Sequence, residues 1–176
     1  MKVGGAIPGS IDSLQAGVKV ALRTYVAELR EFIILHADRH RNYYVQAVGR
    51  EDQDGIVLWC EAVSDAFLER VDRMSPAQRD SLRSLGWGAP GSERFQTPNW
   101  WREFRISAAA DLDPAAYTLA ATLHDVFHFA GEKLDVELGD PALSLEDLQG
   151  SDALRELIVA LGSAGKDDAD DSLRGN

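Results

Sequence analysis

Two histidines come nearest, in type and spacing, to a metal-binding or catalytic motif. His124 and His128 stand four residues apart in the stretch HDVFH, which has helical periodicity, so both imidazoles are predicted to lie on one side of a helix. Helical zinc sites present histidines in this way, but zinc hydrolases also place a glutamate after the first histidine and use a third ligand. Asp125 stands there instead. A structural role is therefore favoured, and no cofactor or metal is expected, although His36 and His40 share the spacing.

A thiol and a carboxylate are adjacent in the stretch LWCEAV. Cys60 lies inside an apolar run without a neighbouring cation to lower its pKa, so it is expected to pack as a small hydrophobic residue. Glu61 must face solvent, pair with a cation or serve a site. We expect it to face solvent or to pair with Arg102 or Arg105. The sequence contains no nucleotide-binding glycine motif and no catalytic triad order, so the protein is predicted not to be an enzyme.

Aromatic residues provide the other candidate site. Adjacent residues of a strand point to opposite faces, so one of the two tryptophans in NWW is predicted to need cover from a helix, a partner or a ligand. Exposed aromatic residues beside a sheet edge suit the capture of an extended peptide. A simpler alternative is that these side chains cover the core beneath a loop. The candidate peptide-binding residues are Trp59, Glu61, Trp100, Trp101 and Phe104. The candidate residues of the preceding turn are Gly86, Trp87, Pro90 and Asn99.

The first half of the chain contains signals for a helix followed by two strands. Ser10 is a suitable cap for an amphipathic helix that the apolar spacing extends to residues 36–40. Strands are predicted at residues 43–48 and 56–63, with an Asp-Gly turn between them. The second of these strands is almost continuously apolar, which predicts a central position with both faces covered at least in part.

The second half alternates helical and extended patterns. Helical periodicity returns over residues 67–74, and Ser75 then caps a new helix that Gly86 closes. In the stretch NWWREFRIS, alternation predicts a strand with Trp100, Phe104 and Ile106 on one face. A further helix is predicted from Asp113-Pro114 to Gly131, and then an edge strand or irregular segment in KLDVELG. One or two short helices follow.

These elements predict an α+β fold, in which an antiparallel sheet packs against helices. The expected organisation is a flexible lead over residues 1–9, one domain over 10–141, a helical segment over 142–162 and an acidic tail over 163–176. The formal net charge of −11 disfavours binding to nucleic acid or to anionic membranes and is compatible with a basic partner. One cysteine, no signal peptide and no long apolar run favour a cytoplasmic location.

Several stretches together resemble a known family. YYVQAVGREDQDGIVLWCEAVSDAFL, LRSLGWGAP, PNWWREF and AATLHDVF resemble, in this order, the actinobacterial branch of the type III secretion chaperone-like and YbjN-like domains. Asp65 departs from that pattern, in which asparagine is commoner. The resemblance implies an α+β fold with a strongly bent antiparallel sheet, and a non-enzymatic role in binding polypeptides, often as a homodimer. It implies no catalytic residues.

Three functions follow from these observations. The leading prediction is a cytoplasmic chaperone or adaptor that binds a polypeptide client, with a homodimer as one expected assembly. The first alternative is an immunity-type or inhibitor protein that masks a basic partner. The second is a metal-dependent enzyme that uses His124 and His128.

Overall fold

The computed structural model describes residues 10–53, 55–92, 96–131, 133–140 and 156–162, and these form the predicted α+β fold. The strands are β1 (Ile33–Asp38), β2 (Tyr43–Asp52), β3 (Gly55–Ala62), β4 (Trp100–Ile106) and β5 (Asp135–Leu138). The longer helices are α1 (Ile11–Ala27), α2 (Pro76–Ser84) and α3 (Leu112–Ala121), which continues into a π-helical turn over Thr122–Val126. A further helix occupies residues 156–162.

The five strands form one antiparallel sheet in the order β4-β3-β2-β1-β5. The hairpin of β2 and β3 begins its return at Gly55, where a Cβ atom would lie 2.2 Å from the carbonyl oxygen of Ile106. Only glycine fits at this position, because β4 passes directly beside it. The order leaves β4 and β5 as the two edge strands.

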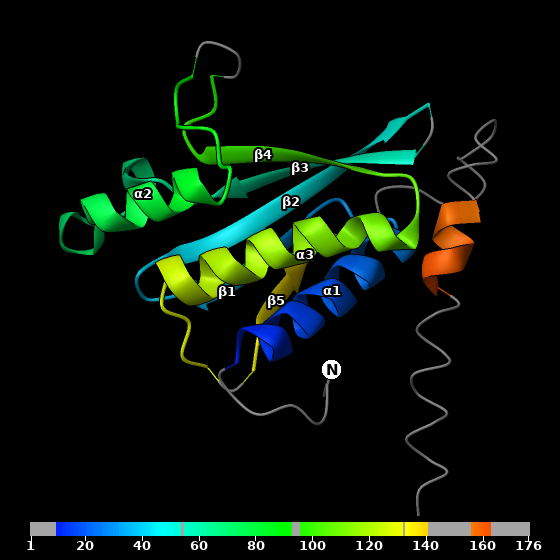
Figure 1. Cartoon of the computed structure of the whole chain (residues 1–176), viewed down its shortest axis with the longest axis horizontal. Coiled ribbons are helices and arrows are strands. Elements are labelled where there is room, and N and C mark those ends of the chain that lie inside the picture. The colour runs from blue at the N-terminus through cyan, green and yellow to red at the C-terminus, as the bar shows by residue number, and fades with distance from the viewer. Residues whose placement is uncertain (1–9, 54, 93–95, 132, 141–155, 163–176) are drawn as a thin grey trace, which may run out of the picture.

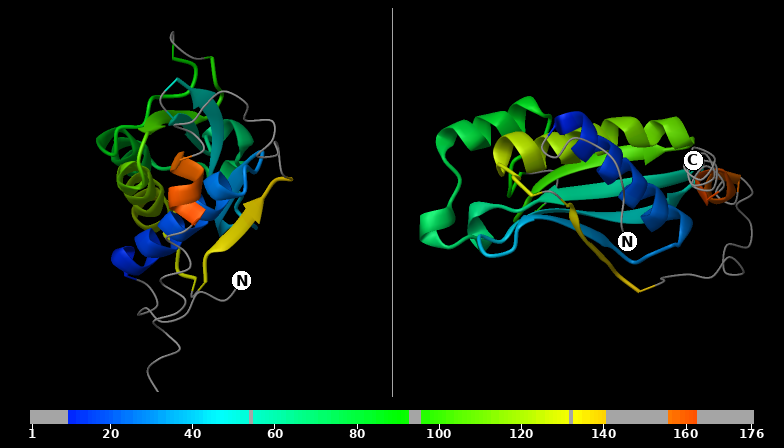
Figure 2. Two further views of the ribbon diagram at one scale, coloured as in Figure 1. Left: turned by 90° about the vertical axis from the view of Figure 1, so that its right-hand side faces the viewer. Right: turned by 90° about the horizontal axis from the view of Figure 1, so that it is seen from below.

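Helices cover one face of the sheet. Figure 1 shows α1 and α3 side by side across the strands, and Figure 2 shows that both lie on the same side. Their apolar stripes and the inward residues of the strands form a single core. None of the described helices packs against the other face. The prediction that β3 is a central strand with both faces covered at least in part is confirmed, because its helix-free face holds the buried Val57 and the partly buried Trp59 and Glu61.

The first helix is shorter than the apolar spacing predicts. It begins at its Ser10 cap, as predicted, but ends at Ala27, and residues 33–38 form β1 instead of continuing the helix. The chain turns at Leu29, which has a φ of 50°. Leu29 and Ile33 keep helical spacing by coincidence, because each contacts the core from a different element.

The segment before α2 is also different from its prediction. Residues 67–74 do not form a helix but lie around two short 3₁₀ turns, Asp65–Phe67 and Arg70–Asp72. Leu68 and Met74 are buried in the core, but Val71 is 89% exposed, so the apolar residues of this segment do not form one buried helical stripe. The helix after it is confirmed, since Ser75 and Gln78 form a reciprocal capping box and Gly86 follows with a φ of 84°.

The last long helix ends earlier than predicted. It does not reach Gly131, because the α-helix becomes a π-helical turn at Thr122 and the backbone turns at His128, with a φ of 54°. His128 therefore lies beyond the helix that carries His124, and the predicted pair on one helical face does not form. KLDVELG does contain an edge strand, β5.

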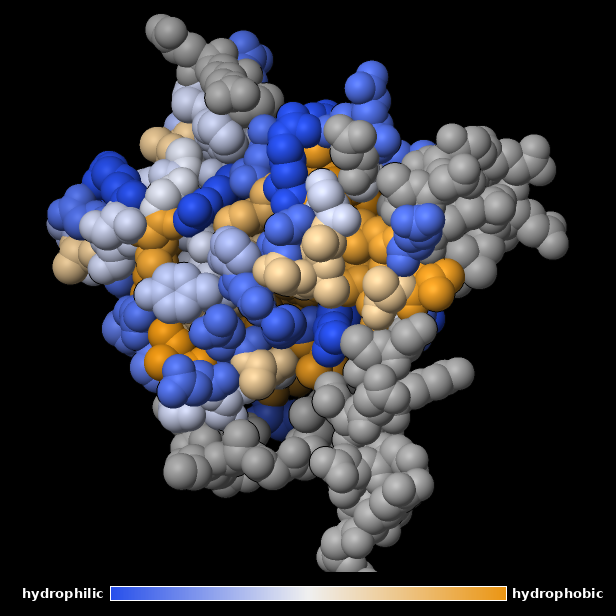
Figure 3. Space-filling view, turned by 45° about the vertical axis from the view of Figure 1, so that its right-hand side comes forward, coloured by the Kyte–Doolittle hydropathy of each residue, from blue (hydrophilic) through white to orange (hydrophobic). Residues whose placement is uncertain are grey.

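The helix at residues 156–162 packs at one end of the core. It buries Leu157, Ile158 and Leu161. Figure 3, turned toward this end of the molecule, shows hydrophobic residues interspersed with hydrophilic ones. The predicted lead, most of the predicted 142–162 segment and the acidic tail lie outside the described residues. Within the described part of the chain, every helix is too short or too polar to cross a lipid bilayer.

Candidate peptide-binding site

Two tryptophans stack on the helix-free face of the sheet. The rings of Trp59 on β3 and Trp101 on β4 are 5.5 Å apart between centroids and inclined by only 4°. The strand register explains the contact, because Trp59 pairs with Glu103 and Trp101 with Glu61, which makes the two indoles diagonal neighbours. Both side chains are partly exposed. The pair is an aromatic surface on a rigid element.

Hydrogen bonds fix the orientation of both indoles. Trp59 donates its Nε1–H to Oε1 of Glu61 at 3.1 Å, and Trp101 donates its Nε1–H to Oγ of Ser92 at 3.1 Å. Because each polar end is satisfied, the remaining exposed part of the pair is apolar.

Glu61 organises the centre of this face. Its carboxylate accepts hydrogen bonds from Gln46 Nε2 at 2.8 Å, Thr97 Oγ1 at 2.6 Å and Asn99 Nδ2 at 3.1 Å, besides the one from Trp59. Burial by itself would raise the pKa of this carboxyl group, but the four hydrogen bonds outweigh burial and hold the pKa below its usual range. A carboxylate with four donors is a structural anchor, and it positions β2, β3 and the segment that leads into β4.

The predicted pairing of Glu61 with an arginine of β4 is wrong. Arg102 lies on the opposite face of the strand and donates to the carbonyl oxygen of Leu85 and to Thr118. Arg105 is on the helix-free face but forms an ion pair with Asp52 of the β2–β3 hairpin. Neutral donors take the place that the sequence assigned to a cation.

Trp101 also depends on a glycine. Gly88 and Trp101 exchange two backbone hydrogen bonds, of 2.8 and 3.1 Å, at the outer edge of β4. A Cβ atom at Gly88 would lie 2.3 Å from Cε2 of the indole, so the ring rests directly on the glycine backbone. The sequence patterns did not predict the roles of Gly88, Ser92, Gln46 or Thr97. Of these four, Gly88 alone carries a local signal, because it lies in the turn-like stretch WGAPG.

Two of the predicted binding residues lie in the core instead. Trp100 is 3% exposed and Phe104 is 8% exposed, because both point toward the helices. Arginines cover their rings, with Cζ of Arg83 5.6 Å from the ring centroid of Trp100 and Cζ of Arg102 4.8 Å from that of Phe104. The alternation of the strand already indicated this side. The structure leaves Trp59, Glu61 and Trp101 together on the helix-free face.

The predicted turn residues hold the segment that leads into β4. Trp87 is buried and donates its Nε1–H to Oγ1 of Thr122 at 2.9 Å, so it joins the end of α2 to the end of α3. Asn99 is buried as well, and its Oδ1 accepts from the backbone N–H of Ser64 while its Nδ2 donates to Glu61. Pro90 lines a shallow cavity of about 330 Å³ between this segment and α2.

The surroundings of the tryptophan pair carry both signs of charge. Val48, the cross-strand partner of Trp59, is 45% exposed and extends the apolar surface onto β2. On the same face, Arg50 approaches Glu103 at 3.5 Å. An apolar strip with polar borders results, which is the usual composition of a protein-binding surface.

The outer edge of β4 lies beside this strip, and among the described residues only Gly88 pairs with it. Since the backbone groups of Trp101 point to Gly88, the alternation of an antiparallel strand directs those of Glu103 and Arg105 to the same outer side. No described residue forms a backbone hydrogen bond with them there. An extended segment could therefore continue the ladder that Gly88 begins.

The other candidate residues show no catalytic arrangement. Cys60 is fully buried, and burial raises its pKa to about 12, so it packs as the sequence predicted. His124 contacts Asp125, and His36 lies on β1 near Glu137. Among the described residues, no cluster of three histidine, cysteine, aspartate or glutamate side chains could hold a metal ion.

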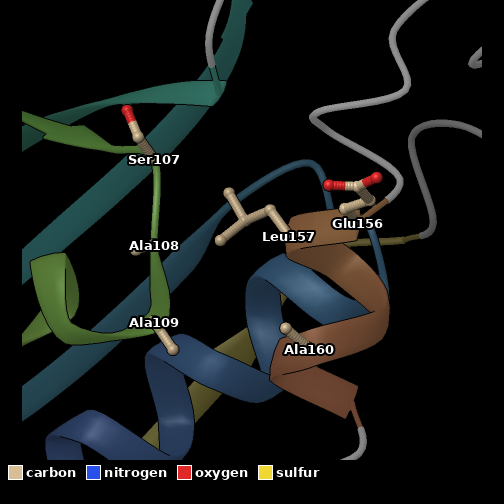
Figure 4. Close-up of a pocket in the computed structure, with 6 residues that line it drawn as sticks. All are labelled: Ser107, Ala108, Ala109, Glu156, Leu157 and Ala160. Carbon is tan, nitrogen blue, oxygen red and sulfur yellow. The ribbon is translucent and has the colours of Figure 1, made fainter.

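The two cavities lined by described residues do not provide a better site. A second shallow cavity, of about 270 Å³, lies between residues 107–109 and the helix at residues 156–162. Figure 4 shows Leu157 pointing from that helix toward the 107–109 segment. The lining of this cavity consists mainly of alanines and one leucine, with few polar groups that could orient a small molecule.

The fold and this face define a class of protein, an α+β domain in which helices cover one side of an antiparallel sheet and an aromatic surface lies on the other. A model of the family described as T3SS (YopN, CesT) and YbjN peptide-binding chaperone 3 (TY-Chap3) matches residues 16–134. The match covers more than half of the chain, so the protein belongs to this family. No curated protein and no solved structure matches the chain.

Proposed function

We propose that this protein is a non-enzymatic chaperone or adaptor that binds an extended polypeptide at Trp59 and Trp101. The observation that carries the proposal is the stacked pair itself, which is partly exposed and held rigidly on the helix-free face. Large rigid aromatic surfaces contribute strongly to protein binding at low cost in conformational entropy. Membership in a peptide-binding chaperone family supports the same function.

The position of the pair suggests how a client would bind. Trp101 lies on an edge strand, and the backbone groups of Glu103 and Arg105 face outward beyond the Gly88 bridge. A client strand added there forms main-chain hydrogen bonds that any sequence can supply, while alternate side chains reach the indoles. This arrangement favours extended segments with an apolar residue next to Trp101.

The net charge of the protein adds a second preference, for clients with basic residues. The net charge of −11 attracts segments with basic residues over distances of about 10 Å at ordinary salt. We place the protein in the cytoplasm on the same sequence grounds as before. Its predicted homodimer stays a prediction.

Binding to a permanently unfolded polypeptide, reduced and alkylated at its cysteines, tests the proposal. We expect measurable binding by the full chain, and we expect Trp101→Ala to weaken it by roughly 1 kcal/mol or more. Tyr117→Ala is the matched control, because Tyr117 is 50% exposed on α3, on the other side of the sheet. Unchanged affinity in the Trp101 variant, or an equal loss in the control, would contradict this site.

A further inference from the structure

The opposite edge of the sheet already holds an extended segment, which is the chain's own β5. Figure 1 shows β5 along β1, and the register pairs Ile34 with Glu137 and His36 with Asp135. The family match ends at residue 134, one residue before β5 begins. The strand that occupies this edge therefore lies beyond the part of the chain that matches the family.

Ionic contacts hold β5 on its helix-free face. Arg39 binds Asp135 through two nitrogens, Nε to Oδ2 at 2.5 Å and Nη2 to Oδ1 at 3.1 Å, and its Nη1 approaches Oε2 of Glu137 at 3.3 Å. His36 Nε2 lies 3.3 Å from the same oxygen of Glu137. Hydrogen bonding to Arg39 lowers the pKa of Asp135, which agrees with a charged contact. The two acidic residues stand at alternate positions and so share one face of the strand.

Apolar contacts hold β5 only weakly on its other face. Leu138 packs against the core, but Val136 is 38% exposed, and the strand has four residues. Short edge elements with few buried contacts open at low free-energy cost relative to the rest of a fold. This strand is therefore a candidate for displacement while the rest of the sheet stays intact.

We propose that the outer edge of β1 is a second polypeptide-recognition site, selective for extended segments with acidic residues at alternate positions. In the free protein, the chain's own Asp135–Leu138 occupies this site. The proposal rests on the proposed polypeptide-binding function and adds a partner chemistry to it. The proposed selectivity follows from β5 itself, because Arg39 and His36 contact its acidic residues, Asp135 and Glu137, which are two positions apart. Asp38 does not compete for Arg39, because its carboxylate accepts the backbone N–H groups of His40 and Arg41.

A tethered occupant makes the site weak for free peptides. Linkage within one chain gives β5 an effective concentration on the order of millimolar, so a peptide at lower concentration competes poorly. Releasing β5 should therefore strengthen the binding of an acidic peptide supplied in trans. Loss of Arg39 should weaken it whether or not β5 is in place.

The test uses a fluorescein-labelled peptide with the sequence of residues 133–140, KLDVELGD, and the full-length protein. The variant D135K/E137K turns both acidic contacts of β5 into repulsive ones. We expect it to bind the peptide at least about tenfold more tightly than the unmodified protein does. The charge-swapped peptide KLKVKLGD should bind that variant at least about tenfold more weakly than KLDVELGD does. The variant E51K/E69K changes the net charge equally at exposed positions away from β5 and should match the unmodified protein.

Two further variants complete the test. Adding Arg39→Glu to D135K/E137K re-pairs the internal strand and should abolish the gain. If the charge reversal unfolds the protein, the milder variant D135N/E137Q replaces it in the test. We expect this variant to bind KLDVELGD about threefold more tightly than the unmodified protein does. Equal binding of KLDVELGD by the unmodified protein and by folded β5 variants would overturn the proposal. Adding Trp101→Ala to D135K/E137K separates the two sites. Peptide binding that survives this change supports the site on β1, whereas binding that is lost with Trp101 belongs to the tryptophan site and would overturn the proposal.

Discussion

The two faces of β3 and β4 use the same alternating backbone for different purposes. On the helix-covered face, Leu58, Cys60 and Ile106 are completely buried in the core. On the other face, Trp59 and Trp101 stay partly exposed, and hydrogen bonds and ring stacking hold them. Burial stabilises the first face, and a saturated carboxylate organises the second.

This difference predicts that changes on the two faces affect stability and the proposed polypeptide binding separately. A defect on the covered face removes buried apolar contacts and should unfold the domain. A defect on the helix-free face should change the shape of the aromatic surface at a smaller cost in stability. The variants that follow break or sharpen this contrast, beginning with the largest expected effect.

Leu58→Ala should be the most destabilising of these changes. The side chain is 0% exposed, so its truncation leaves a cavity in a closed core. We expect the free energy of unfolding to fall by about 2–5 kcal/mol, measured by denaturant titration. The fraction that stays folded should still bind an unfolded polypeptide normally. A loss below about 1 kcal/mol would mean that this face is less tightly packed than the structure indicates.

Glu61→Gln should have the next largest effect. An amide cannot accept all four hydrogen bonds that the carboxylate accepts, so partly buried donors lose their partner. We expect a loss of about 1–3 kcal/mol at neutral pH. Glu103→Gln is the matched control on the same face, since Glu103 makes a single ion pair, with Arg50 at 3.5 Å, and should lose less. An equal loss in the two variants would contradict the anchoring role of Glu61.

The pH dependence of stability sharpens the same point. The pKa of Glu61 is lowered in the folded protein, so its carboxylate favours folding above the ordinary glutamate pKa. This contribution is lost as the pH falls through the folded-state value. The difference in unfolding free energy between the unmodified protein and Glu61→Gln should therefore narrow as the pH drops from about 5 to about 3. A difference that is constant over this range would show that the charge of Glu61 is unimportant.

Tyr117→Ala should have the smallest effect on stability. Tyr117 is half-exposed on α3. We expect a change within about 0.5 kcal/mol, measured by the same denaturant titration. A larger loss would disqualify Tyr117 as the control for the tryptophan site, and Phe67, which is 49% exposed near α2, would replace it.

Local patterns predicted much of this fold. The β2–β3 hairpin, the cap of α2 and the alternation of β4 follow from neighbouring residues, and the structure confirms each of them. The strand β1 was missed because Leu29 and Ile33 fit helical spacing, and the turn at Leu29 carries no glycine or proline signal. Residues 33–38 form a strand because they pair with β2 and β5, and these contacts between distant segments are not visible in the local sequence pattern.

The candidate site was only partly predictable for a similar reason. Trp59, Glu61 and Trp101 were recognised from residue type and position. Two of the four donors to Glu61 were not, because Gln46 and Thr97 are 15 and 36 residues away from it in the chain. Trp100 and Phe104 were named as candidate binding residues, although their shared parity with Ile106 is consistent with the core, where the structure buries them. The alternation of β4 determines which tryptophan faces outward, and it can be read from the sequence. The hydrogen bonds that orient the outward tryptophans depend on contacts between segments, which cannot.

Hydroxyl-radical footprinting of the unmodified protein tests the central claim most directly. The full chain is labelled alone and with a saturating unfolded polypeptide, and the oxidation of each aromatic residue is compared. The account predicts that the polypeptide protects Trp59 and Trp101 and leaves Tyr117 and Phe67 as reactive as before. Protection of Tyr117 with no change at Trp59 and Trp101 would contradict it.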